Sequence, residues 1–170
     1  MGVLASTNVL VIGVGNRTRG DDAAGPAVAD LVRAAEIPHV RVLEHSGEGA
    51  SLLESWRRDN IVYLVDAAHS GADPGFVHIF DAHADAIPFE FLRYSSHAFS
   101  VAEAIELARV LGRLPSRLTL IAIEGKAFDA GASLSPDVAK AISIVARNIE
   151  MEIRELPHSA AGVATCTNSA

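Results

Sequence analysis

Acidic and imidazole side chains stand at three separate places in the sequence. Asp21 and Asp22 follow a glycine-rich stretch after the first apolar run, and Asp66 closes the third apolar run. His97 lies in an irregular stretch before a helical pattern. Two carboxylates and an imidazole suit a borderline cation such as nickel or zinc, whereas an all-oxygen set suits magnesium. Three protein ligands would also leave coordination positions open for substrate or water. The sequence therefore offers Asp22, Asp66 and His97 as a candidate metal site.

Each of these three residues also has a plain structural interpretation. Asp22 can stabilise the first turn of a helix, where an acid is common. Asp66 can form a turn, and His97 can be a surface or capping histidine. His69, three residues after Asp66, is the nearest rival as a ligand. The residue types alone leave these alternatives open.

The elements that must position these residues alternate along the chain. Runs rich in β-branched residues predict strands at 8–14, 40–44, 60–66, 76–80 and 118–123. Helical patterns lie at 24–35, 50–57, 100–111 and 136–156. Strands separated by helices form βαβ units and a parallel sheet. Ligands of such sheets bind outside the carboxyl ends of the strands, which is where the three candidate residues fall.

The connection between Asp66 and the run 76–80 interrupts this alternation. It has nine residues and contains Gly71, Pro74 and Gly75. A parallel crossover needs about a dozen residues or more, usually with a helix. We therefore predict that the fourth strand is antiparallel. The expected fold is a three-layer α/β fold, with a twisted, mostly parallel five-stranded sheet flanked by helices on both faces.

Length and composition predict a single domain and argue against several classes of protein. The chain has 170 residues, of which 49% are hydrophobic, and this length is typical of one domain. We assign residues 1–156 to a single α/β domain and expect residues 157–170, which lack apolar periodicity, to form a flexible tail. The net charge of −7 argues against nucleic-acid binding. The apolar runs are too short to span a membrane. A single cysteine and the lack of a signal-peptide pattern favour a cytoplasmic location.

A dinucleotide site is one alternative for the first loop. Gly13 and Gly15 follow a strand and precede a helix, as a dinucleotide-binding loop requires. However, Thr18 stands where the third glycine belongs, and Asp21 and Asp22 would repel a pyrophosphate at the helix N-terminus. The carboxylates make this alternative the weaker one.

A phosphoacceptor receiver domain is a second, non-enzymatic alternative. Such a module gathers two acids, a further Asp and a Lys around magnesium, and Asp21, Asp22, Asp66 and Lys126 could supply these groups. The acid pair, however, lies about seven residues beyond the first strand rather than at its end. The short connection after Asp66 also leaves no room for the helix that an all-parallel receiver needs.

Five sequence blocks carry a resemblance to a known family. They are Gly13 to Gly25, Asp66 to Gly75, Ser96 to Pro115, Ile123-Glu124-Gly125 and Leu134-Ser135-Pro136. In this order and at similar spacing, they resemble the [NiFe]-hydrogenase maturation endopeptidases. The resemblance covers about residues 8 to 150. Any single block is a weak signal, but five in sequence are a strong one.

The resemblance implies both a fold and an activity. It implies a twisted five-stranded sheet with one antiparallel strand, and an enzyme that removes the C-terminal extension of the hydrogenase large-subunit precursor after nickel insertion. By motif position, Asp22, Asp66 and His97 are the implied catalytic residues and the implied ligands of nickel carried by the precursor. Zinc or cadmium can occupy the same ligands. The family implies no resident metal and no organic cofactor.

The chain departs from the family pattern near the implied ligands. Ala23 stands where a glycine is usual, and the loop 46–49 reads Ser-Gly-Glu-Gly where many relatives carry a Gly-Thr pair. Together with Asn16 of the first block, Gly47 and Glu48 are expected to contact the precursor, although Glu48 can equally be a solvated loop acid. The alternative function for the chain is a nickel-binding maturation chaperone that binds precursor without cutting it.

Overall fold

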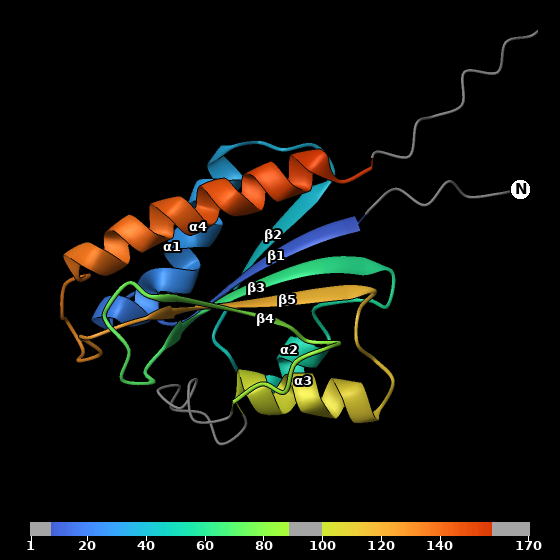
Figure 1. Ribbon diagram of the computed structural model, residues 1–170, viewed down its shortest axis with the longest axis horizontal. Helices are drawn as coiled ribbons and strands as arrows, with labels where there is room; N and C mark the ends of the chain where they lie inside the picture. Colours follow the sequence, from blue (N-terminus) through green and yellow to red (C-terminus); the bar gives the residue numbers. More distant parts are fainter. Residues whose placement is uncertain (1–7, 89–99, 158–170) are drawn as a thin grey trace, which may run out of the picture.

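The computed structural model describes residues 8–88 and 100–157. Strands and helices alternate along these residues, except that β4 follows β3 without a helix between them (Figure 1). The elements are β1 (Asn8–Val14), η1 (Gly20–Ala23), α1 (Ala24–Ala34), β2 (Val40–His45), α2 (Gly49–Leu53), β3 (Asn60–Ala68), β4 (Val77–Asp81), α3 (Val101–Val110), β5 (Arg117–Glu124) and α4 (Pro136–Glu155). Helices α1 and α4 cover one face of the sheet, and α2 and α3 cover the other. The predicted three-layer arrangement is therefore confirmed.

The sheet has the strand order β2-β1-β3-β5-β4. The pairs β1–β2, β1–β3 and β3–β5 are parallel, whereas β4 pairs antiparallel with β5 at the edge of the sheet. The connection between Ala68 and Val77 contains no helix. This confirms the predicted antiparallel strand and the physical reason for it, because a connection this short cannot carry the chain back to the end of the sheet where β3 begins.

Strand β3 contributes to both hydrophobic cores. Val62 and Leu64 pack on the side of α2 and α3, while Tyr63 and Val65 pack on the side of α1 and α4. Burial of both faces explains why the sequence of this strand is almost continuously apolar. Because side chains alternate along a strand, Asp66 belongs to the same face as Leu64.

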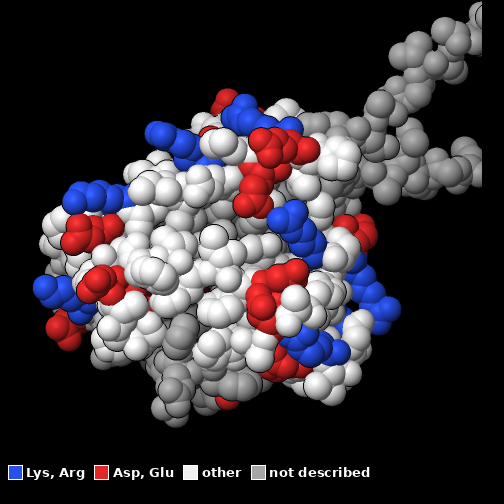
Figure 2. All heavy atoms as spheres, viewed as in Figure 1, with Lys and Arg blue, Asp and Glu red and all other residues white. Residues whose placement is uncertain are grey.

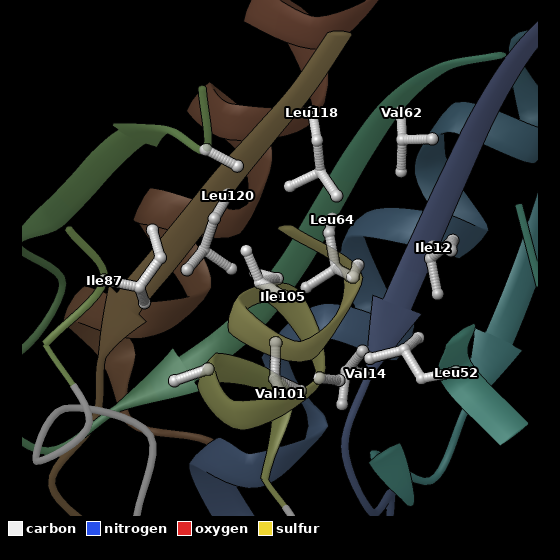
Figure 3. Packing of buried hydrophobic residues seen from close by; sticks show 14 of the residues in the cluster. Ile12, Val14, Leu52, Val62, Leu64, Ile87, Val101, Ile105, Leu118 and Leu120 are labelled. Atoms are coloured by element: carbon white, nitrogen blue, oxygen red, sulfur yellow. The ribbon is translucent and has the colours of Figure 1, made fainter. Parts of the chain in front are cut away.

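Helix α3 begins at a capping box formed by Ser100 and Glu103. The Ser100 hydroxyl accepts a hydrogen bond from Glu103 N–H, and the Glu103 carboxylate accepts one from Ser100 N–H. Val101 and Ile105 then point from α3 into the core beneath the sheet (Figure 3). The N-cap of this helix, Ser100, is thereby fixed three residues after His97 in the sequence.

Two of the predicted boundaries differ from the structure by two residues or more. Strand β3 continues to Ala68, so Asp66 lies two residues before its end, because pairing with β5 persists up to Glu124. Helix α2 ends at Leu53 rather than near residue 57. The side chain of Ser135 does not cap α4, although the residue occupies the N-cap position.

The face presented in Figure 2 is largely uncharged in its middle, with acidic and basic side chains around it. A groove of about 350 Å³ lies between the edge strand β4 and helix α4. Ile79, Ile144 and Met151 line the groove and are 64%, 58% and 54% exposed.

Helix α4 ends at Glu155, and the predicted tail lies outside the described residues except for Pro157. Across residues 8–88 and 100–157, no helix is long and apolar enough to cross a membrane.

Candidate active site

Asp22 and Asp66 lie in different elements, but the charge of Asp22 acts on the carboxyl group of Asp66. Asp22 is in η1 and Asp66 is in β3, and the two residues are 8% and 4% exposed. Burial raises the pKa of Asp66 well above its ordinary value, and the negative charge of Asp22 raises it further. The hydrogen bond of 2.8 Å that Asp66 accepts from Ala67 N–H acts in the opposite direction. The structure thus brings these two predicted site residues together.

Asn16 lies directly against Asp22. Its backbone N–H donates to both Oδ2 and the main-chain oxygen of Asp22, at 3.1 and 3.2 Å. Its side-chain oxygen accepts hydrogen bonds from the N–H and the hydroxyl of Thr18. The loop after β1 therefore folds back onto η1, and Asn16, an exposed residue, borders the acid.

Gly47 and Glu48 follow β2 on the same side of the sheet as the end of β1. Gly47 is buried with φ +91°, and a β-carbon there would lie 3.0 Å from Cγ1 of Val14. Glu48 is the N-cap of α2, where its carboxylate accepts hydrogen bonds of 2.9 Å from the N–H groups of Ala50 and Ser51. These bonds lower the pKa of Glu48 to about 2. The structure gives Glu48 a capping role that the sequence analysis did not anticipate.

His97, the third predicted ligand, lies outside the described residues. The nearest described element is the start of α3, where Cγ2 of Val101 lies 4.0 Å from the position of a β-carbon on Gly47. Helix α3 therefore begins beside the loop 46–49. Over the described ranges, no group of three or more His, Cys, Asp or Glu is arranged to hold a metal ion. The three-ligand set that includes His97 stays a prediction.

Asp21 has a role that the sequence analysis missed. It is fully buried, and its carboxylate accepts hydrogen bonds from the N–H groups of Lys126 and Ala127 and from both the N–H and the hydroxyl of Ser135, at 2.7 to 2.9 Å. Burial by itself would raise the pKa of Asp21, but these hydrogen bonds outweigh it and lower the pKa. Asp21 therefore joins η1 to the connection between β5 and α4. The sequence feature that could have pointed to this contact was Ser135 in the block Leu134-Ser135-Pro136.

Glu124 is a second buried acid whose role was missed. It is 1% exposed, and its carboxylate accepts hydrogen bonds from the N–H and hydroxyl of Ser70 and from the N–H of Gly71. His78 Nε2 lies 3.3 Å from the same carboxylate. Glu124 thus holds the start of the β3–β4 connection. Its sequence signal was a carboxylate at the end of a buried strand.

Comparison with known proteins settles the family. A family model described as hydrogenase maturation protease matches residues 27–152. The chain belongs to the hydrogenase maturation protease family. The matched range contains Asp66 and His97 and begins after Asp22. Members of this family are named as proteases, which are hydrolases, so the family and the enzyme class predicted from the sequence are confirmed.

Individual relatives agree with the family assignment. The chain is 27% identical over 141 residues to the hydrogenase expression/formation protein HupD of Thiocapsa roseopersicina, with 79% of this chain and 62% of the relative covered. The chain thus spans less than two thirds of that relative. It is 25% identical over 151 residues to the hydrogenase 2 maturation protease of Escherichia coli K12, covering 86% of this chain and 91% of the relative. The structure of the hydrogenase maturating endopeptidase HybD from E. coli has the same fold, with a TM-score of 0.69, 21% identity, and 88% and 93% of the two chains covered.

The geometry does not favour the receiver alternative for this maturation protease. The edge strand β4 is antiparallel, whereas a receiver sheet is parallel throughout. One of the two acids that a receiver would use, Asp21, has both carboxylate oxygens engaged by the β5–α4 connection. The other acid of the pair, Asp22, is the one whose charge raises the pKa of Asp66.

Proposed function

We propose that this maturation protease is the cytoplasmic endopeptidase that removes the C-terminal extension of a nickel-loaded [NiFe]-hydrogenase large-subunit precursor. The observation that carries the proposal is the placement of two buried carboxylates, Asp22 and Asp66, in one environment in a chain of this family. The partner is the precursor protein, and neither a nucleic acid nor a membrane takes part.

In this proposal, nickel arrives with the precursor and docks between Asp22, Asp66 and His97. Two neighbouring carboxylates repel each other, and a divalent cation between them relieves that repulsion. Carboxylate and imidazole ligands suit nickel, and zinc or cadmium would bind the same groups. The metal is part of the substrate, and the enzyme uses no organic cofactor.

The chemistry is hydrolysis of a peptide bond that the docked nickel holds in place. Fixing the scissile bond beside the carboxylates can supply several kcal/mol of barrier lowering. The nickel polarises the carbonyl of the scissile bond or lowers the pKa of an attacking water. Asp22 or Asp66, once released from the nickel, accepts a proton from that water as the water oxygen adds to the carbonyl carbon. The same carboxyl group then gives the proton to the leaving amine nitrogen as the C–N bond breaks.

The residues that border the two acids are the proposed contacts of the precursor chain. Asn16 lies against Asp22, and Gly47 lies against the end of β1. Each oxygen of the Glu48 carboxylate accepts one backbone hydrogen bond, from Ala50 and Ser51. A carboxylate oxygen has a second lone pair, so Glu48 can still accept hydrogen bonds from the precursor.

The test is mass spectrometry of a nickel-loaded large-subunit precursor incubated with this protein. Nickel-free precursor and the His97→Ala variant are the controls. Loss of a C-terminal peptide only with nickel and intact His97 would support the whole proposal. Complex formation without cleavage would favour the maturation chaperone. An absence of both cleavage and binding would contradict the proposed function.

A further inference from the structure

The adjacent acids Asp21 and Asp22 are used in different ways. All four hydrogen bonds to the Asp21 carboxylate come from residues of the connection between β5 and α4, and both of its oxygens are engaged. In addition, the N–H of Asp21 donates to the carbonyl of Ala127 at 2.7 Å. Asp22, by contrast, shares its environment with Asp66. Asp21 is therefore not available as a ligand, and its function must be sought in what it holds.

The segment that carries Asp22 cannot fix its own position. Element η1 is a four-residue 3-10 helix, and its N-cap residue, Arg19, makes no side-chain capping bond. Helices this short are marginal without outside contacts. Gly20 supplies one such contact, since it has φ +54° and a β-carbon there would lie 2.3 Å from the carbonyl oxygen of Ala127. The N–H of Asn16 supplies a second, through its hydrogen bonds to Asp22, and the Asp21 carboxylate supplies a third, to residues distant in the sequence.

Strand β5 and the residues that follow it help to position both Asp66 and Asp22. Asp66 lies on β3 opposite Ala122 of β5. Two residues after the end of β5, the N–H of Lys126 donates to the Asp21 carboxylate. The same strand and the residues that follow it thus place Asp66 through sheet pairing and Asp22 through its neighbour Asp21.

We propose that Asp21 is a positioning residue that sets where Asp22 lies relative to Asp66, acting through Ser135 and the backbone of residues 126–127. The inference rests on the proposed function, because it is the precursor reaction that requires this placement. A misplacement of about 1 Å at a reacting group can cost on the order of 100-fold in rate. The link spans more than a hundred residues of sequence, since Asp21 and Ser135 are 114 positions apart.

Ser135 offers a clean way to weaken the link. Its hydroxyl donates to Asp21 at 2.7 Å and makes no capping bond to α4, so Ser135→Ala removes a contact of Asp21 without uncapping the helix. Ser135→Thr keeps the hydroxyl. Ser116→Ala is the matched control, because the Ser116 hydroxyl also makes one bond of 2.7 Å, to the carbonyl of Asn60 beside the opposite end of β5.

Two readouts test the proposal: the kinetics of cleavage of nickel-loaded precursor, and hydrogen–deuterium exchange of the amides in residues 16–23. We expect Ser135→Ala to lower kcat about 10-fold with KM nearly unchanged, and to speed exchange in residues 16–23. Ser135→Thr should restore both values. Ser116→Ala should change neither, even where its melting temperature falls as much as that of Ser135→Ala.

The outcomes separate this inference from the proposed function. If Ser135→Ala leaves exchange in residues 16–23 unchanged, or if Ser116→Ala slows cleavage equally, Asp21 has only a general structural role and the inference is overturned. If the unmodified protein does not cleave the precursor, the proposed function fails. In that case the exchange comparison alone decides whether Asp21 holds the segment that carries Asp22.

Discussion

The negative charge of Asp22 raises the pKa of the buried Asp66 carboxyl, although the two residues are 44 positions apart in the sequence. Burial is the larger cause of the shift, and the two effects act in the same direction. Such a pair is unfavourable while both groups are ionised and becomes favourable when a cation lies between them. This relationship is what makes the corner formed by η1 and β3 a candidate site for the nickel of a precursor.

The variant Asp66→Asn should fold normally and fail to process precursor. The amide has the shape of the carboxyl group but carries no charge, so the repulsion by Asp22 is removed while the nickel loses a ligand. We expect a melting temperature at least as high as that of the unmodified protein, and a cleavage rate lower by at least about 100-fold. Thermal unfolding and mass spectrometry of the precursor measure the two effects. An intact cleavage rate would remove Asp66 from the mechanism.

Glu48→Ser separates helix capping from precursor binding. Serine is a good N-cap residue, so the variant keeps α2 capped while removing the negative charge. If Glu48 contacts the precursor, KM should rise about fivefold while the melting temperature stays the same. Steady-state cleavage kinetics with a range of precursor concentrations give KM. An unchanged KM would mean that Glu48 serves only as the cap of α2.

Glu124 should make the stability of the fold depend on pH in the acid range. Burial by itself would raise its pKa, but hydrogen bonds from Ser70, Gly71 and His78 outweigh burial and lower the pKa below the ordinary value of 4.5. A carboxyl group with a lowered pKa in the folded state stabilises the protein above its unfolded pKa, and this contribution is lost as the pH falls through the folded pKa. The protein should therefore lose stability progressively below about pH 4.5.

The variant Glu124→Gln tests this pH dependence. The amide N–H₂ of glutamine cannot accept hydrogen bonds from the donors that surround the Glu124 carboxylate. We therefore expect the variant to lower the free energy of unfolding by about 2 kcal/mol at pH 7. The difference from the unmodified protein should shrink below pH 4.5. Urea unfolding at pH 7, 5 and 3.5 measures it, with Glu54→Gln as a control because the Glu54 side chain is 72% exposed. A difference that stays constant across this range would rule out the ionised Glu124 carboxylate as its source.

Gly25→Ala should strongly destabilise the packing of α1 on the sheet. A β-carbon at Gly25 would lie 2.2 Å from the carbonyl oxygen of Val14 and 2.5 Å from that of Val65. Both are backbone atoms of β1 and β3, so relief requires the helix to move away. We expect a loss of about 3 kcal/mol in the free energy of unfolding, measured by urea denaturation. Unchanged stability would mean that α1 can shift without cost.

Much of the fold could be predicted from local patterns. The β-branched runs located all five strands to within about two residues, because a strand buried on both faces must be apolar along its length. The antiparallel β4 followed from chain length alone, since nine residues are too few for a parallel crossover. The Ser100–Glu103 capping box followed from residue type and spacing. Each of these inferences depends on neighbours in the sequence.

The candidate site could be predicted in part. Asp22 and Asp66 were expected at the carboxyl edge of the sheet, and the structure places them in one environment. Because Asp21 and Asp22 are adjacent and of the same residue type, their chemistry alone did not show that Asp21 binds the β5–α4 connection while the charge of Asp22 acts on Asp66. It also gave Asp66 the last place in β3, whereas the strand continues to Ala68.

By itself, the sequence determined the order of the five strands and four α-helices along the chain, the antiparallel direction of β4 and the resemblance to the family, whereas the strand order β2-β1-β3-β5-β4 came from the structure. Only the tertiary structure decided that Asp21 is held by Ser135 and the backbone after β5, that Glu124 holds the β3–β4 connection, and that Glu48 caps α2. The physical reason is that a buried carboxylate takes its hydrogen-bond donors from whichever backbone folds against it. For Asp21 those donors lie more than a hundred residues away, where no local periodicity reaches.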